Sequence, residues 1–416
     1  MSTDRVVAIV DAYSTARYFA PLFRAKGFRC VHVRTAPSIP AVYAPTFVAS
    51  DFGDEVVHTG DPALTAAALK EFDPVAVIAG IESGVELADR LSEALDLRTN
   101  GTELTEARRD KFLMAETVRA AGVPVAAQIL TRDREDLRAW FAESGARRVV
   151  VKPVKSAGND GIHFCDDEAA VLAAFDALVD TDSALDLRND AVLAQEYLEG
   201  VEYYVNTVSL DGVHHVTDIH STRHLNVNGV RDLLGGSHLL ERRGPEQDLL
   251  VDYATSVLDA LGVRNGPAHT ELKLTPAGPR LIETASRICG ADLPVLVGEA
   301  IGESQLEWTV DAYTDPERFT ARRVADYVIL RHAICVNMVS PRAGTLVSYP
   351  KLAQVEALES FHAALVKVKP GGTVSVTRSD FTYPMLVHLL NPSSALLWRD
   401  YATTRWLDGD SFYEIA

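Results

Sequence analysis

Two glutamates occupy mirrored positions on either side of a turn in residues 269–287. This segment contains two short strand-like runs that meet at the sequence Thr-Pro-Ala-Gly, which predicts a hairpin. Glu271 and Glu283 are equidistant from Ala277, so a hairpin in this register sets them opposite each other on one face. Two facing carboxylates repel unless a cation lies between them, and Mg²⁺ suits oxygen ligands that also carry substrate phosphates. An ordinary hairpin with exposed acids is the alternative interpretation.

A lysine followed by a glycine-containing loop lies earlier in the chain. The valines of 149–151 predict a buried strand, which delivers Lys152 to a loop containing Ser156, Gly158 and Gly161. Glycines let backbone N–H groups approach an anion closely, and a lysine beside them adds a positive charge. The Walker A pattern is absent because no Gly-Lys-[Ser/Thr] follows four variable residues. A purely structural turn is the alternative.

Residues 191–208 contain two further strand candidates around Glu199 and Gly200. A segment that links two lobes can present its backbone N–H and C=O groups to the edge of an adenine ring. A carboxylate just beyond it can hold ribose hydroxyls. These positions are Gln195, Glu196, Tyr197 and Leu198 for the adenine, and Glu202 for the ribose. A plain hairpin explains the same pattern.

The order of Lys111, the Lys152 loop, the hinge at 195–202 and the paired glutamates resembles the ATP-grasp superfamily over most of the chain. The run 282–290 is most similar to bacterial L-amino acid (dipeptide) ligases. The resemblance implies an ATP-dependent ligase that joins an amino-acid carboxylate to the amine of a second amino acid. Such enzymes work through an acyl-phosphate and release ADP and phosphate. The implied cofactors are ATP and Mg²⁺, for which Mn²⁺ can substitute.

The resemblance also assigns roles to individual residues. It implies that Lys111 and Lys152 contact ATP phosphates, that Glu271 and Glu283 bind Mg²⁺, and that Arg287 acts on the acyl-phosphate. The implied amino-acid pocket contains Arg223, His238, Gly290 and Ala291.

Two positions depart from the family pattern. Many relatives have an asparagine metal ligand where this chain has Ala285, and often have Gly-Gly where it has Asn159 and Asp160. A nucleotide-binding regulatory protein without turnover is therefore one alternative to a ligase. An ATP-grasp ligase for a different acid or amine is another.

Composition limits the class of partner. The 416 residues are 47% hydrophobic, which is enough for two or three domains. A formal net charge of −18 argues against nucleic acid or anionic membrane as the main partner. We expect small amino-acid substrates, a cytoplasmic location because no leader or transmembrane run occurs, and reduced thiols at all four cysteines. A homodimer is compatible with the sequence.

The predicted fold class combines α/β and α+β architecture. Alternating helices and strands predict a doubly wound parallel sheet in residues 1–103. The ATP-grasp domain is expected at 104–323, with a small lobe at about 112–194 and a large lobe at about 195–323, and a strand-rich accessory domain at 324–416. Residues 104–122 read as one helix. Five histidines between 214 and 238 leave a transition-metal site open, although their spacing matches no compact ligand motif.

Overall fold

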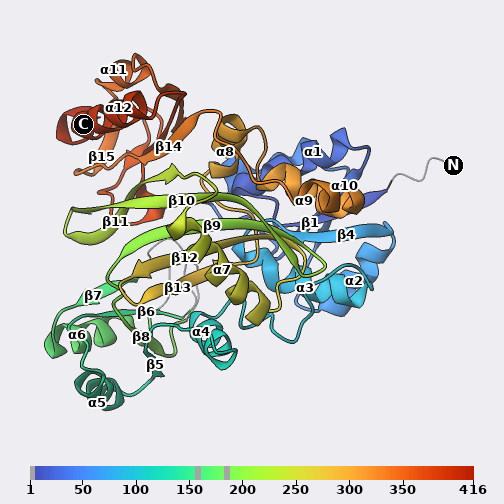
Figure 1. Ribbon diagram of the computed structural model, residues 1–416, viewed down its shortest axis with the longest axis horizontal. Helices are drawn as coiled ribbons and strands as arrows, with labels where there is room; N and C mark the ends of the chain where they lie inside the picture. Colours follow the sequence, from blue (N-terminus) through green and yellow to red (C-terminus); the bar gives the residue numbers. More distant parts are fainter. Residues whose placement is uncertain (1–4, 155–160, 182–187) are drawn as a thin grey trace.

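A computed structural model describes residues 5–154, 161–181 and 188–416. These residues form a parallel sheet near the N-terminus, a small antiparallel sheet and one long eight-stranded sheet through the middle of the molecule (Figure 1). A short three-stranded sheet lies in the C-terminal part: β15 (Gly344–Ser348), β17 (Thr373–Val374) and β19 (Glu414–Ile415). The predicted combination of α/β and α+β architecture is confirmed.

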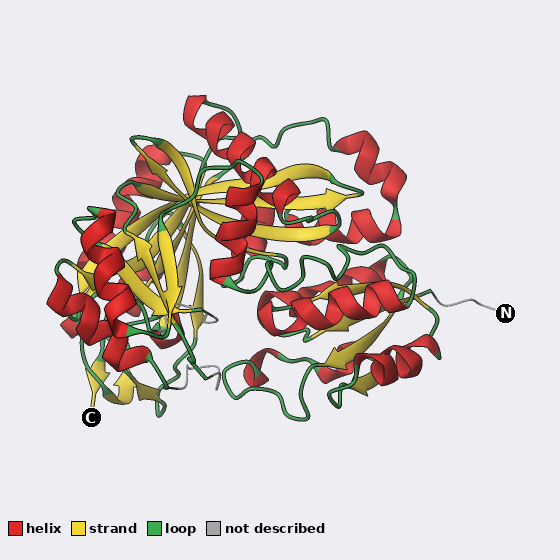
Figure 2. Cartoon of the chain, turned by 90° about the horizontal axis from the view of Figure 1, so that it is seen from below, coloured by secondary structure: helices red, strands yellow, loops and turns green. Residues whose placement is uncertain are grey.

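The N-terminal sheet has the strand order β3-β2-β1-β4, and all its pairings are parallel. Helices cover both of its faces (Figure 2). The central strand is therefore buried throughout, as its valine-rich sequence predicts. The elements are β1 (Val6–Val10), α1 (Phe19–Ala25), β2 (Arg29–Arg34), β3 (Asp54–Val57), α2 (Pro62–Lys70), β4 (Pro74–Ala79) and α3 (Val85–Ala94).

The second sheet lies within residues 128–196 and has the order β5-β8-β6-β7, with antiparallel pairing. The predicted helix at 104–122 is shorter than expected and begins at Lys111. The reason is Asp110, whose side chain accepts hydrogen bonds from the N–H groups of Phe112 and Leu113 and so caps the helix. The elements are α4 (Lys111–Ala120), β5 (Gln128–Thr131), α5 (Arg134–Ser144), β6 (Val149–Pro153), β7 (His163–Cys165), α6 (Glu168–Leu178) and β8 (Val192–Glu196).

The long sheet has the order β13-β12-β9-β10-β11-β14-β18-β16. Its last three strands come from the C-terminal part of the chain, so that part extends the sheet of the large lobe (Figure 1). The strands are β9 (Val201–Leu210), β10 (Val213–Val227), β11 (Val230–Leu239), β12 (Gly266–Thr275), β13 (Gly278–Ala285), β14 (His332–Asn337), β16 (Phe361–Val366) and β18 (Met385–Asn391). The helices of this half are α7 (Pro245–Ala260), α8 (Leu293–Ile301), α9 (Gln305–Thr314), α10 (Pro316–Arg322), α11 (Leu352–Glu356) and α12 (Ser394–Leu407).

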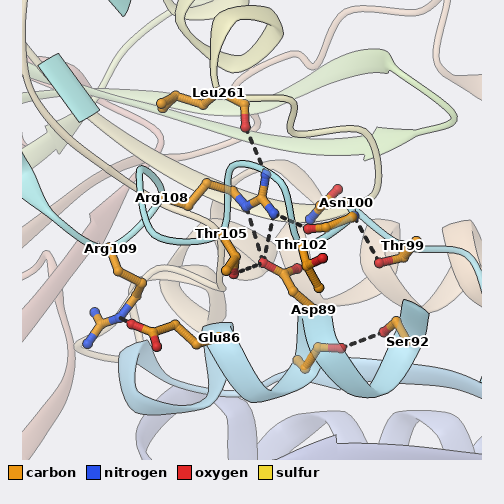
Figure 3. Close-up of polar contacts among 12 residues, drawn as sticks. Glu86, Asp89, Ser92, Thr99, Asn100, Thr102, Thr105, Arg108, Arg109 and Leu261 are labelled. Atoms are coloured by element: carbon orange, nitrogen blue, oxygen red, sulfur yellow. Dashed lines mark hydrogen bonds and ion pairs between the residues drawn. The ribbon is translucent and has the colours of Figure 1, made fainter. Parts of the chain in front are cut away.

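A buried arginine joins the N-terminal sheet to the large lobe (Figure 3). Arg108 is 1% exposed and donates from Nη2 to Oδ2 of Asp89 at 2.9 Å and from Nη1 to the carbonyl of Leu261 at 2.9 Å. Asp89 lies on α3, and Leu261 follows α7. Thr105 donates a further hydrogen bond to Asp89, at 2.6 Å. This network fixes how the two parts of the molecule pack together.

No helix among the described residues is long and apolar enough to span a membrane.

Candidate active site

A cavity of about 1080 Å³ lies where the N-terminal sheet, the β12–β13 hairpin and the C-terminal strands meet. Each of the three regions contributes to its wall. The predicted site residues that line it are Lys111, Glu271, Glu283, Arg287, Gly290 and Ala291. Ser14 and Asp380 also line it, so residues more than 250 positions apart in the sequence surround one space.

The predicted pairing of the two glutamates is confirmed, since Glu271 and Glu283 are cross-strand partners. A count outward from Ala277 pairs Thr275 with Pro279. In the structure Thr275 pairs with Gly278, so the turn is one residue shorter. A bulge beside Glu271 shifts the register by one residue and restores the expected pair.

The two glutamates differ in their electrostatic surroundings. Burial by itself raises the pKa of Glu283, but the ammonium group of Lys111, which donates to its carboxylate, and that of Lys152 lower it to about 2. The pKa of Glu271 is raised by burial and by the negative charge of Glu283. Glu283 is thus the permanently ionised member of the pair.

His269 orients Glu271. It lies two residues earlier on the same strand face, and its Nε2 is 3.1 Å from Oε1 of Glu271. Its Nδ1 is 2.7 Å from Oδ1 of Asn206, which in turn donates to Asp218 at 2.5 Å. Burial opposes protonation of His269, but Cys289 and Glu271 outweigh it and raise the pKa to about 10. A cationic His269 donates from both nitrogens and holds the carboxylate of Glu271 in one orientation.

The donor set around the hairpin fits Mg²⁺. Among the described residues, no group of three or more His, Cys, Asp or Glu side chains is arranged to hold a metal ion alone. Magnesium is usually bound by one or two carboxylates, with water and substrate phosphates as its other ligands. Two facing glutamates near two lysines match that arrangement, and Ala285 supplies no ligand atom.

Lys152 is buried beside the same pair. It is 5% exposed and donates to Oε1 of Gln195 at 3.0 Å. Burial and the charge of Lys111 lower its pKa to about 8. Of the loop that follows, Gly161 has a left-handed backbone with φ of 68°, which favours glycine. Ser156 and Gly158 lie outside the described residues, as do Asn159 and Asp160.

The segment predicted as a hinge connects β8 to β9, so the two strands expected around it are present. The N–H groups of Glu196 and Tyr197 already donate to the carbonyls of Ala127 and Arg148. Leu198 is 9% exposed, and its N–H has no partner within the part of the chain that the structure describes. This N–H is therefore available to a ligand.

Glu202 also lies where a nucleotide ligand was expected, close after the hinge on β9. Its carboxylate is 3.6 Å from Nε2 of His224. Burial lowers the pKa of His224, but the neighbouring carboxylate of Glu202 outweighs burial and raises it.

Arg287 is held by a carboxylate that the sequence analysis did not identify. Its Nε donates to Oε2 of Glu82 at 3.0 Å, and Arg109 donates to the other oxygen of the same group. Burial opposes ionisation of Glu82, but the two arginines lower its pKa. Glu82 follows the carboxyl end of β4, where parallel sheets commonly bind ligands. That position was the available signal.

Gly290 and Ala291 form a fixed part of the cavity wall. Ala291 and Asp292 both have left-handed backbones, with φ of 57° and 53°. The carboxylate of Asp292 accepts hydrogen bonds from Arg17 at 2.8 and 2.5 Å, so the N-terminal layer holds this strained loop in place.

Arg223 and His238 do not reach the cavity, contrary to the prediction. The guanidinium of Arg223 lies 5.3 Å from the ring centre of Trp398, and the ring of His238 lies 4.8 Å from it. Ser237, the neighbour of His238 on β11, does line the cavity. Alternate strand residues point to opposite faces, so the residue beside the predicted one faces the cavity. The histidines of 214–238 likewise form no metal-binding group within the described residues.

Comparison with known proteins agrees with this geometry. Residues 146–294 match the ATP-grasp domain family. The chain is 31% identical to dapdiamide A synthase of Enterobacter agglomerans, over 99% of this chain and 98% of that protein. It is 24% identical to alanine–anticapsin ligase of Bacillus subtilis over 53% of this chain and 49% of that one. The crystal structure of L-amino acid ligase from Bacillus licheniformis superposes with a TM-score of 0.78 at 18% identity, covering 100% of both chains.

The chain belongs to the ATP-grasp family of carboxylate–amine ligases. It is an ATP-dependent enzyme that forms amide bonds.

Proposed function

We propose that the protein joins two amino acids, one through its carboxylate and the other through its amine, by way of an acyl-phosphate. The observation that carries this proposal is the facing pair Glu271 and Glu283, with Lys111 on one carboxylate and Arg287 lining the same cavity. A cavity of about 1080 Å³ has room for two small substrates beside a triphosphate end.

Each group has a part in this reaction. Lys111 and Lys152 neutralise charge on the phosphates of ATP. Leu198 and its hinge neighbours receive the adenine, and Glu202 the ribose. Mg²⁺ bound by Glu271 and Glu283 would withdraw charge from the transferring phosphoryl group. Arg287, fixed by Glu82, would stabilise the acyl-phosphate and the oxyanion that follows it.

The proposed chemistry has two steps. A carboxylate oxygen of the first amino acid forms a bond to the γ-phosphorus of ATP, and the bond to the leaving ADP oxygen breaks. The amine nitrogen of the second amino acid then attacks the acyl carbon, and phosphate leaves with the electron pair of the broken C–O bond. No protein nucleophile is required, because positioning and charge neutralisation carry both steps.

A screen of amino-acid pairs tests this proposal. Phosphate release and product mass are measured for each pair, and the nucleotide product is identified. ADP, formed only when a carboxylate substrate is present, is the expected product. AMP and pyrophosphate would refute the acyl-phosphate, and ATP binding without hydrolysis for every pair would favour a regulatory protein.

A further inference from the structure

The C-terminal segment 365–383 forms one wall of the cavity and lies outside residues 146–294, which match the ATP-grasp family. Lys367 follows β16, and Asp380 begins the turn that leads to β18. The N–H groups of Lys367 and Val368 both donate to the carbonyl of Pro384 at 3.0 Å. The two stretches that carry Lys367 and Asp380 are therefore adjacent, and both side chains border the cavity.

Of the lysines and arginines in the cavity wall, four already have acidic partners, whereas Lys367 and Lys369 have none within the described residues. Arg17 is paired with Asp292, Lys111 with Glu283, and both Arg109 and Arg287 with Glu82.

Lys367 differs from these cations. Within the described residues, its ammonium group has no hydrogen bond or ion pair, and the nearest aromatic ring, that of Tyr383, has its centre 5.8 Å away. Lys367 is exposed in the cavity wall, so an incoming anionic ligand can reach its ammonium group.

Asp380 offers the complementary charge. Its Oδ1 is buried and has no hydrogen-bond partner in the part of the chain that the structure describes. Burial raises its pKa, and the hydroxyl of Tyr383 and the charge of Lys367 oppose that rise. Buried carboxylate oxygens are rarely left without a donor in a protein that has its ligand bound.

We propose that Lys367 and Asp380 bind the head group of the amine-donating amino acid, Lys367 its α-carboxylate and Asp380 its α-ammonium. This inference rests on the proposed function. The carboxylate of the acid substrate is consumed in the reaction, but that of the amine donor persists into the product. A cation that is not engaged elsewhere can hold it throughout the reaction, and Lys367 meets that requirement beside the stretch that carries Asp380.

Asp380 then accounts for proton transfer. The ammonium group must lose one proton before its nitrogen can attack, and Asp380 has an open oxygen to accept it. The nitrogen forms its bond to the acyl carbon as phosphate departs. The second proton of the nitrogen leaves with the phosphate, so charge and atoms balance.

Hydroxylamine separates this site from the rest of the reaction. It is uncharged at neutral pH, lacks a carboxylate and converts an acyl-phosphate to a hydroxamate. In Lys367→Met, we expect hydroxamate to form at the rate of the unaltered protein. The KM for the amine-donating amino acid should rise about 10- to 150-fold, because a hydrogen bond to a charged group contributes that much to binding. The preference for that amino acid over its uncharged α-carboxamide should disappear, whereas Lys367→Arg should keep it.

Two further lysines serve as controls. Lys351 packs on Trp406, outside the cavity wall, so Lys351→Met should leave KM and the preference unchanged. Lys369 also lines the cavity, and loss of the preference in Lys369→Met but not in Lys367→Met would overturn the assignment. Asp380→Asn should slow turnover with the amino acid but not with hydroxylamine, and equal slowing with both would remove Asp380 from the head-group site. If the unaltered protein forms no hydroxamate with any carboxylate substrate, the proposed function itself fails.

Discussion

Arg108 and Arg109 are neighbours in the sequence, and both bind carboxylates of the N-terminal layer, yet they lie in different kinds of network. Figure 3 shows the network of Arg108. Arg108 is 1% exposed and joins Asp89 to the backbone of the large lobe. Arg109 lines the cavity and shares Glu82 with Arg287. The first network is closed, because protein groups surround it on all sides.

The difference shows that an ion pair alone does not identify a functional site. Both networks contain an arginine and a carboxylate, but burial raises the pKa of Asp89, whereas two arginines lower that of Glu82. An excess of positive charge next to a cavity is suited to an anionic ligand. Access to the cavity and the balance of charge separate the active-site network from the structural one.

The largest effect should come from breaking the closed network. Arg108→Met leaves Asp89 buried without its cation, which should cost about 3 to 5 kcal/mol of stability. Thermal denaturation should show a large fall in Tm, while kcat per folded molecule stays near normal. Arg109→Met is the matched variant, and we expect the reverse pattern from it. If Arg109→Met is the less stable of the two, the distinction between the networks is wrong.

The next largest effect is expected from a substitution in the β12–β13 hairpin, which should lower turnover. Glu283→Gln removes an anionic metal ligand but keeps an oxygen that can accept from Lys111. We expect kcat to fall about 100- to 1000-fold, comparable with the loss of a group that stabilises transition-state charge. Circular dichroism and Tm should remain close to those of the unaltered protein. Glu103→Gln, at an exposed position, is the control, and equal activity of the two variants at saturating Mg²⁺ would remove Glu283 from the metal site.

A smaller and more selective effect is expected at the cavity wall. Ala291→Trp fills space beside Arg287 and should cost about 1 to 3 kcal/mol in binding a bulky amino acid, or about 5- to 150-fold in kcat/KM relative to a small one. ATP affinity should change little. Ala291→Gly suits the left-handed backbone and serves as control. A parallel fall for both amino acids would place position 291 outside the pocket.

The smallest effect is a pH dependence of ATP binding. The pKa of Lys152 in the free protein is lowered to about 8 by burial and by Lys111. Phosphates favour the charged form, so above this pH ATP must bind together with a proton. The Kd should then rise about tenfold per pH unit. Calorimetry from pH 7 to 9.5 measures this rise, and Lys152→Arg, which stays charged, should remove it. A Kd independent of pH in the unaltered protein would argue against contact between Lys152 and phosphate.

The sequence predicted the parts of the site that follow from local periodicity. The hairpin that pairs Glu271 with Glu283, the strand that carries Lys152 and the hinge before Glu202 each depend on nearby residues, and each is present. Arg223 and His238 were assigned to the pocket through the family resemblance, but the pleat of β10 and β11 turns them toward Trp398.

Contacts between distant segments could not be predicted from the sequence. Glu82 binds Arg287 across 205 positions, and Lys367 reaches the cavity because the C-terminal strands join the long sheet. No local pattern encodes either contact. Strand β3 was also missed, since its four residues include two acids and carry little apolar periodicity.

Transfer of oxygen from the acid substrate to phosphate tests the acyl-phosphate most directly. The reaction is run with an amino acid labelled with ¹⁸O in both carboxylate oxygens, and the released phosphate is analysed by mass spectrometry. The proposed mechanism predicts ADP and one ¹⁸O atom in each phosphate, because the C–O bond breaks on the carbon side of the bridging oxygen. Unlabelled phosphate, or label that appears in AMP, would contradict it.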